Sequence, residues 1–559
     1  MEWFLSHSTK QSRLWGLVFG VIVAIICVCG AYVYRTNSLF GASASVLALG
    51  LVEFVCVAAV VAVLAALFFA ALPRLSAAGA AFPLSPRTTF IALCLALFAV
   101  WLLCLRAYWP GLLTYDIPTQ IDMVFSGSWS TQQPPLHTLI LAFFFQLEGL
   151  AGLHSITWYT FFQMLCLAAA LAYLVSFMVA RGAKTWFVVL VLVFLLLNPV
   201  LALFAITPTK DVFLGVCLIP LMLELVQLVE SPNTFFASPA PPARLALWLV
   251  LSCLFRSNIA IVAFIFAGLA CIVLRRYWKQ VALLFGASLL CVVLVAMPGY
   301  RLLGIGAGGS AAASVPVQQV ARVLVNHVDE LPANELAVIE DVLPVEEAIK
   351  EYNPRFADKV VRLFKGRKVG LAPMMQKVVE AGKVWAAWGV RYPADYMDAF
   401  ICLNVPYWYP FAQTPDPYSE RAYIETQRWK ESDYYTVELP NPQAPLYGFY
   451  EKVADYSAFA GTPLAAVFSP AMPFFYLALA LCALLAQRER PRRALALAFL
   501  LVFWLSFVFG PVSNMRYMLP LFALYPLLGA FILQAQAVFG ERGLAASHAR
   551  AKPEGGEAV

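Results

Sequence analysis

Residues 88–108 read TTFIALCLALFAVWLLCLRAY, a run of 21 positions in which Arg106 is the only charged side chain. An apolar run of about 20 residues can cross the ~30 Å hydrocarbon core of a bilayer as an α-helix, because each residue adds about 1.5 Å. The apolar residues are continuous and do not alternate with polar ones, which favours a helix over the strand of a membrane barrel. This stretch therefore predicts a transmembrane helix.

Similar apolar runs are found along most of the chain. Hydrophobic residues make up 62% of its 559 positions and charged residues 13%, whereas soluble domains carry roughly 25% charged residues. The fold class that follows is an all-α polytopic membrane protein with about twelve transmembrane helices, an N-terminal bundle over 1–298 and a C-terminal set over 464–540. The expected spans are 14–34, 45–73, 88–108, 157–180, 185–206, 211–230, 244–256, 257–274, 280–298, 464–486, 494–510 and 516–538.

The charged residues are distributed unevenly. Segment 299–463 contains 20 acidic and 16 basic residues, and the rest of the chain contains 12 acidic and 22 basic ones. Basic residues in short loops mark the cytoplasmic side of a membrane protein. One orientation, with the N-terminus inside, places every basic loop there: Lys10 and Arg13; Arg74 and Arg87; Arg181 and Lys184; Arg275, Arg276 and Lys279; Arg488, Arg490, Arg492 and Arg493. We therefore expect a bacterial inner-membrane protein with both termini in the cytoplasm and a disordered tail over 541–559.

Two long segments face outward in this topology. The first, 107–156, contains an apolar stretch, 134–152, that is short and interrupted by Glu148. Counting this stretch as a span would move the later basic loops outside, so we expect a re-entrant or interfacial helix. The second, 299–463, is long enough for a periplasmic domain. Its apolar residues recur at three- and four-residue spacing, as in VQQVARVLVNHV, which predicts mainly helices.

A carboxylate stands directly after the span with which we began. Asp116 lies in WPGLLTYDIPTQID (109–122), where prolines and a glycine predict a turn. A carboxylate at the membrane boundary can accept a proton from an acceptor hydroxyl, although a single loop aspartate is often only solvated. Gln120 and Asp122 follow at spacings that suit one helical face. We interpret Asp116 as a candidate catalytic residue, with Gln120 and Asp122 as candidate substrate contacts.

His137 lies in STQQPPLHTLIL, at the entrance to the expected re-entrant helix. It could orient a carboxylate or bind phosphate, or it could simply begin the helix at the interface. Asp116, Asp122 and His137 are acceptable ligand types for Mg²⁺ or Mn²⁺, which leaves a divalent cation open as a cofactor without a defined metal site. The 12 cysteines lie almost all within apolar runs and indicate neither a disulfide framework nor a metal site.

Four further candidates lie at the outer ends of predicted spans. Lys210 and Asp211 occur in TPTKD; they could form a structural ion pair, or Lys210 could meet a phosphate. Arg256, in LFRSN, and Arg516, in MRYMLP, lie on the outer side, against the bias of the other basic residues. An arginine there needs an anionic partner, either phosphate or a carboxylate such as Asp116 or Asp211. Neighbouring side chains that could contribute to binding are Asn258 and Tyr517.

At these residues the chain resembles the GT-C superfamily, membrane glycosyltransferases that use polyprenyl-phosphate sugars. The features that carry the resemblance span about 110–520 and are GLLTYDIPTQ, QPPLHT, TPTKD, LFRSN, VPVQQVARV, YNPRFADKV and MRYMLP. The resemblance implies an outward first loop with Asp116 as base and an inverting transfer. Within VPVQQVARV, the additional candidate substrate contacts are Gln318, Gln319 and Arg322.

The function we expect is transfer of a sugar from a polyprenyl-phosphate donor to an unknown envelope acceptor at the outer membrane face. Its partners would be the lipid bilayer, the lipid-linked sugar and that acceptor, with no nucleic acid. Two alternatives remain open. One is a transporter or flippase of an envelope lipid, against which no inverted repeat is visible. The other is a non-catalytic, glycan-binding component of envelope assembly.

Overall fold

The structure is a computed structural model that describes residues 8–147, 155–306, 313–366, 374–412, 422–426, 440–487 and 491–535. Throughout these residues the regular structure is helical, and extended pairing is limited to isolated bridges such as the one between Ala81 and Lys184. The prediction of an all-α protein is therefore confirmed. The tail over 541–559 and Glu148 lie outside the described residues.

Within the described residues, six helical segments are long and apolar enough to cross a membrane. They are α2 (Lys10–Thr36), α3 (Ala44–Ala77), α4 (Pro86–Ala107), α7 (Ser155–Ala180), α10 (Lys210–Glu230) and the segment Arg275–Leu302, which joins η2 (Arg275–Tyr277), α14 (Trp278–Leu294), the π-helical turn η3 (Val295–Gly299) and α15 (Tyr300–Leu302). These helices make the chain a multi-pass membrane protein.

The remaining apolar helices are bent or short. Two pairs bend by 52° and 46° and bring the number of possible spans to eight: α8 (Thr185–Leu196) with α9 (Pro199–Ile206), and α27 (Met515–Ala523) with α28 (Tyr525–Leu533). The shorter ones are α6 (Pro135–Phe145), α12 (Ala240–Phe255), α13 (Asn258–Val273) and α25 (Met472–Ala486). As expected, α12 and α13 are hinged at Arg256, and α6 is too short to span. The count of twelve spans remains a prediction.

The basic loops gather at one end of the bundle. Arg181 and Arg493 both pair with Glu230, at N–O distances of 2.7 and 3.5 Å. The backbone of Phe82 donates to Ala183. These contacts join the loops after α3, α7 and α10 to the start of α26 (Pro491–Phe507). The loops with the acidic and basic site candidates lie at the opposite ends of the same helices.

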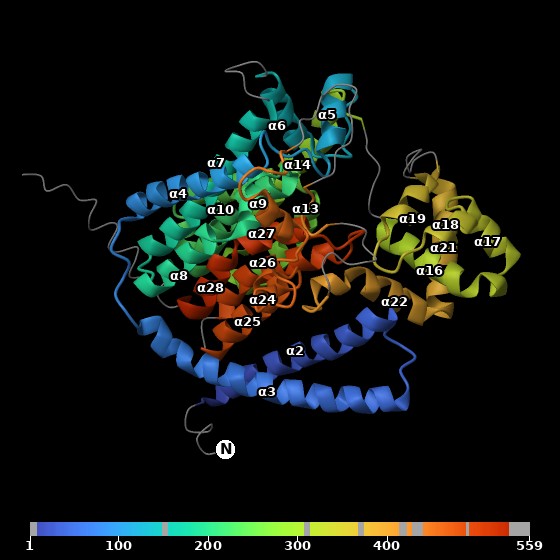
Figure 1. The fold of residues 1–559 in the computed structure, drawn as a ribbon, viewed down its shortest axis with the longest axis horizontal. Helices are drawn as coiled ribbons and strands as arrows, with labels where there is room; N and C mark the ends of the chain where they lie inside the picture. Colours follow the sequence, from blue (N-terminus) through green and yellow to red (C-terminus); the bar gives the residue numbers. More distant parts are fainter. Residues whose placement is uncertain are drawn as a thin grey trace, which may run out of the picture.

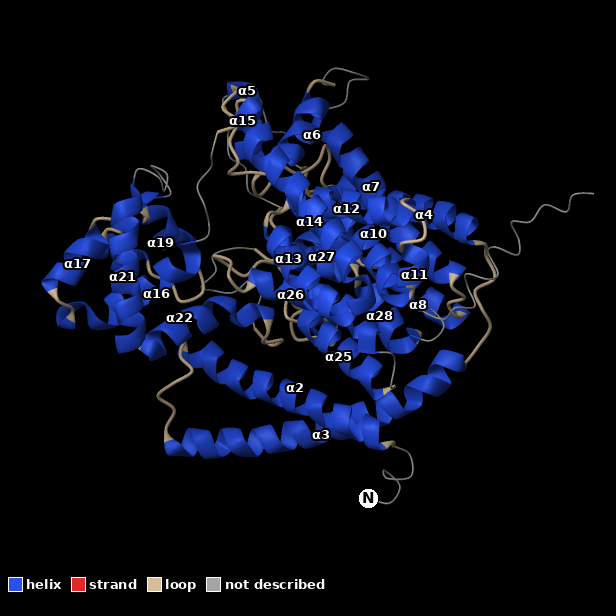
Figure 2. Cartoon of the chain, turned by 180° about the vertical axis from the view of Figure 1, so that it is seen from behind, coloured by secondary structure: helices blue, strands red, loops and turns tan. Residues whose placement is uncertain are grey.

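A lobe with its own apolar core stands beside the bundle (Figure 1). It is formed by α16 (Ser314–His327), η5 (Val328–Glu330), α17 (Ala333–Glu340), α18 (Val345–Glu351), α19 (Asp358–Leu363), α21 (Met375–Arg391) and α22 (Pro393–Asn404). We call this the helical lobe. The view from behind shows the same separation (Figure 2).

The described residues 405–412, 422–426 and 440–463 do not join this lobe, contrary to the single domain over 299–463 that we expected. Aromatic residues in these ranges, Tyr423 and Tyr450 among them, pack into the core of the membrane bundle instead. The helices in this part of the segment are η7 (Val405–Tyr407) and α23 (Tyr447–Ala454). The remaining short helices of the described residues are α5 (Ile117–Ser126), α11 (Pro232–Phe235) and α24 (Ala465–Phe468). Large aromatic side chains gain most by burial against an apolar surface, and the bundle provides it.

Candidate functional site

The loop after α4, the first of the two long loops expected to face outward, holds Asp116 in a tight turn. Tyr115 has a positive φ of 54°, and α5 begins directly after Asp116 with Pro118 in its first turn. The backbone N–H of Tyr115 donates to Glu425 Oε2 at 3.3 Å, and the Glu425 N–H donates to the Tyr115 hydroxyl at 2.9 Å. These two hydrogen bonds therefore fix the loop to the segment around Glu425, which packs against the bundle.

Asp116 forms ion pairs with cations from two distant helix starts. Its Oδ2 lies 3.1 Å from Lys210 Nζ and 3.1 Å from an Nη of Arg516. Capping of the two helices sets these positions: the Thr209 side chain accepts from the second residue of α10, and Asn514 Oδ1 accepts from the N–H of Arg516 at 3.0 Å. The structure thus brings the start of α5, the start of α10 and the start of α27 together.

A second ion pair lies next to the first. Arg256 donates to the fully buried Asp211, whose other oxygen accepts from Thr209 Oγ1 at 3.2 Å. The guanidinium of Arg256 stacks 4.2 Å from the ring centre of Tyr517, and that of Arg516 lies 4.9 Å from the same ring. Tyr517 therefore lies between the two arginines and fixes both by cation–π contact.

A cavity of about 630 Å³ opens beside these pairs. Its charged lining side chains, within the described part of the chain, are Lys210 and Arg256, and no carboxylate lines it. Asn258 also lines it and donates to Ser506 Oγ at 2.7 Å. Apolar side chains from α13, α14 and α26 complete the wall, with Pro134 and Pro135 on the side of the first loop. The cavity therefore has two cations in a wall that is more apolar than polar.

Lys210 and Arg256 keep donors for a ligand. The ammonium group has three N–H donors, and its contacts are Asp116 and Gln133 Oε1, the latter at 2.8 Å. The guanidinium has five N–H donors. Both side chains remain 17–18% exposed, toward the cavity that they line. The structural pairing with a carboxylate is realised for Arg256 with Asp211 and for Arg516 with Asp116, but these pairs do not use all five N–H donors of either guanidinium group.

His137 has a structural position within the first loop. It is fully buried, with Nδ1 2.9 Å from Gln120 Oε1 and Nε2 2.8 Å from the Tyr159 hydroxyl. The Tyr159 hydroxyl also lies 2.9 Å from Gln163 Oε1, and the Gln163 amide donates to backbone carbonyls before α10. Burial, followed by the charge of Lys210, lowers the pKa of His137 to about 3. A neutral histidine that bridges α5, α6 and α7 orders the loop and is not a cation for phosphate.

The expected single face of Asp116, Gln120 and Asp122 is not formed. Gln120 is buried against His137 and Thr138, and Asp122 is half-buried on a different side of α5, because residues two apart on a helix point in different directions. Asp116, Asp122 and His137 do not gather as ligands either. No group of three or more His, Cys, Asp or Glu side chains that could hold a metal ion occurs within the described ranges.

The candidates from VPVQQVARV lie in the helical lobe and not at this cavity. Gln318 donates to the carbonyl of Asn353, and the Gln319 side chain contacts Tyr396 and Trp385. Arg322 pairs with Asp395 and Asp398, at 3.4 and 3.0 Å. The structure does not bring these three residues to the cavity, and their role as substrate contacts stays a prediction. They are polar residues of the amphipathic helix α16, and their contacts hold α16 against neighbouring elements of the lobe.

The chain matches a family described as a family of unknown function, DUF6020, over residues 3–542. It belongs to this family. No curated protein and no solved structure matches it. The match covers almost the whole chain, so the ion-pair cluster, the cavity and the helical lobe all lie within the DUF6020 region.

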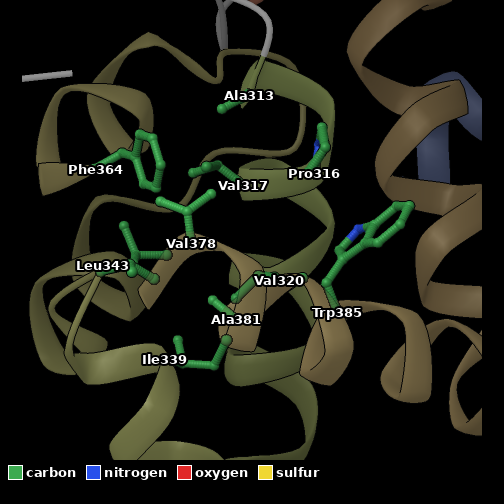
Figure 3. Close-up of a pocket in the computed structure, with 12 residues that line it drawn as sticks. Ala313, Pro316, Val317, Val320, Ile339, Leu343, Phe364, Val378, Ala381 and Trp385 are labelled. Atoms are coloured by element: carbon green, nitrogen blue, oxygen red, sulfur yellow. The ribbon is translucent and has the colours of Figure 1, made fainter. Parts of the chain in front are cut away.

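This DUF6020 chain has a second cavity, in the helical lobe, with a different lining. It measures about 250 Å³ and lies between α16 and α21 (Figure 3). Figure 3 shows Val317, Phe364 and Val378 pointing into it, with Trp385 at its edge. No charged side chain lines it among the described residues. It offers no groups for acid–base or phosphate chemistry, so the cavity beside Asp116 is the candidate site.

Sequence reasoning missed several residues of the DUF6020 site. Gln133 could have been found, because it stands in the same short motif as His137. Phe507, whose ring lies 4.9 Å from the Arg256 guanidinium, looks like any other apolar residue of a span. Tyr115 and Glu425 are 310 positions apart in sequence, and no local pattern links them.

Proposed function

We propose that this DUF6020 protein is a membrane glycosyltransferase that moves a sugar from a polyprenyl-phosphate donor to an envelope acceptor. One observation carries the proposal: Lys210 and Arg256 line a largely apolar cavity that no carboxylate lines, and Asp116 is held by Lys210 next to it. A lipid phosphate requires this combination, since its head is anionic and its tail apolar. A guanidinium and an ammonium together suit a phosphate group.

The chemistry would proceed by direct displacement. The acceptor hydroxyl oxygen forms a bond to the anomeric carbon while the bond from that carbon to the phosphate oxygen breaks. The hydroxyl proton passes to Asp116, and the leaving phosphate carries the negative charge. Lys210 and Arg256 stabilise that charge because they are fixed before the reaction begins. A single displacement inverts the configuration at the anomeric carbon.

The topology that accompanies this proposal is the GT-C-like one expected from the sequence. It has about twelve spans, both termini in the cytoplasm of a bacterium and the helical lobe in the periplasm. The grouping of Arg181 and Arg493 at the end of the bundle opposite to Asp116 supports that orientation. The unknown acceptor would then reach Asp116 from the outer aqueous side, while the donor enters from the bilayer.

The test is complementation of a deletion strain, with envelope glycans and lipids measured by mass spectrometry. Wild type should restore the missing glycan, and Asp116→Asn should lower its amount by at least a hundredfold, because the general base is lost. Asp341→Asn is the matched control, since Asp341 forms only an exposed pair with Lys377 in the helical lobe. Membrane levels of all three proteins should be equal.

Undiminished glycan with Asp116→Asn would refute the assignment. A lipid translocator is the second candidate, because the same cavity would admit a phospholipid head group. It would move a labelled lipid across a proteoliposome without covalent change. Such translocation by both wild type and Asp116→Asn would decide for that function.

A further inference from the structure

A groove in the membrane bundle leads away from the candidate site. It lies between α12 and α14, measures about 610 Å³ and is open toward the lipid side. Its walls are almost entirely apolar, with Gln280 and Ser288 as the polar residues among those that line it. Small side chains form much of the floor and edge: Ala243, Ala246, Ala287 and Cys291.

The groove and the cationic cavity follow one another along the same two helices. On α12 the groove ends at Val250, and the cavity begins at Cys253 and continues to Arg256. On α14 the groove ends at Cys291, and the cavity begins at the next residue, Val292. The two voids therefore share both walls, and the path runs along the α12–α14 interface to Lys210 and Arg256.

The size of the path suits one hydrocarbon chain. From Ala243 to Arg256 the path is about 20 Å long at about 1.5 Å per residue, roughly two thirds of the ~30 Å hydrocarbon core. At about 30 Å³ for each water-sized group, the groove holds on the order of twenty carbon atoms. That is room for about four isoprene units, so the rest of a long chain would continue from the groove into the bilayer.

We propose that the α12–α14 groove binds the isoprenoid chain of the lipid phosphate whose head group lies at Lys210 and Arg256. This inference rests on the proposed function for the choice of an isoprenoid. It adds where the chain lies and that the protein distinguishes lipids by chain length. A short prenyl phosphate reaches only the cationic cavity, whereas a long one also fills the groove.

The experiment is a binding measurement with no sugar present. Ala287 is exposed and lines the groove, and Ala282 is exposed on the same helix but does not line it. We would measure the affinity of the full-length protein in detergent for undecaprenyl phosphate and for geranyl phosphate. Ala287→Trp should weaken binding of undecaprenyl phosphate about tenfold and leave geranyl phosphate unchanged, while Ala282→Trp changes neither.

Three outcomes would overturn the groove proposal, and a fourth would overturn only the proposed role of Asp116 as base. Unchanged undecaprenyl phosphate affinity with Ala287→Trp, or equal weakening of both ligands, would show that the chain does not lie in the groove. Dioleoyl phosphatidylglycerol that displaces undecaprenyl phosphate at equal concentration would show a site for ordinary bilayer lipid. Chain-length-dependent binding by a protein whose Asp116→Asn variant still restores the glycan would keep the groove and remove the proposed base. The two proposals can therefore fail separately.

Discussion

The end of the bundle that holds Asp116 and the helical lobe both contain arginine–carboxylate networks, but the surroundings of the two networks differ. In the lobe, Arg322 bonds Asp395, Asp398 and the carbonyl of Asn37, and Asp398 also accepts from Ser38 and Leu39. These bonds fasten the lobe to the loop after α2. At the bundle end, Arg256 has one carboxylate partner, Asp211, and faces a cavity.

The cavities of the two regions differ in whether charged side chains line them. The void of the lobe lies among apolar side chains, away from the Arg322 network. The void of the bundle has Lys210 and Arg256 in its wall. Charged pairs of similar geometry are therefore structural where they bridge two packed elements, and they are available for a ligand where a cavity reaches their cations. Three predictions test this distinction.

The largest expected effect is on stability. Asp211→Ala leaves Arg256 without its carboxylate, and breaking a buried pair from one side costs about 3–5 kcal/mol. Asp398→Ala should cost roughly 1–2 kcal/mol, because Arg322 keeps Asp395. Thermal unfolding of the purified variants in detergent measures both.

A matched double variant serves as the control for this pair. Asp211→Ala combined with Arg256→Met removes both charges and should recover part of the lost stability. If Asp398→Ala were more destabilising than Asp211→Ala, the lobe network would depend more on one carboxylate than the pair in the bundle does. The comparison of the two networks would then be wrong.

The second effect is on ligand binding. Lys210→Met should weaken undecaprenyl phosphate binding by roughly tenfold to a hundredfold, the value of one or two charge-assisted hydrogen bonds. Lys377→Met, in an exposed pair of the lobe, should leave the affinity unchanged. Equal affinities of wild type and Lys210→Met in the same assay would mean that the cavity does not bind the phosphate.

The smallest effect comes from filling each cavity by one Ala→Leu change. Ala381→Leu occupies the void of the lobe and should alter stability by no more than about 1 kcal/mol, with unchanged lipid affinity. Ala260→Leu narrows the cavity of the bundle and should weaken undecaprenyl phosphate binding several-fold. Weaker lipid binding with Ala381→Leu would instead assign the ligand to the lobe.

The sequence predicted much of the candidate site, because charged residues are rare in and beside the apolar runs of the chain. Asp116, Lys210, Asp211, Arg256 and Arg516 were all identifiable as polar residues at the ends of apolar runs, and all five meet in the structure. Arg322 was a candidate only through the resemblance in VPVQQVARV, and it lies in the charged network of the helical lobe. In a helix with many polar residues, a charge alone does not distinguish a ligand contact from packing between helices.

What the sequence determined by itself was the class of protein. The length and continuity of an apolar run are local properties, and they decide for each segment whether it can span a bilayer. It also determined which side chains could carry chemistry at the membrane boundary. Only the tertiary structure decided which of them meet, that His137 is an internal link, and that Lys210 and Arg256 face a void while Arg322 does not. Those outcomes depend on how helices far apart in the chain pack, and no local pattern encodes that packing.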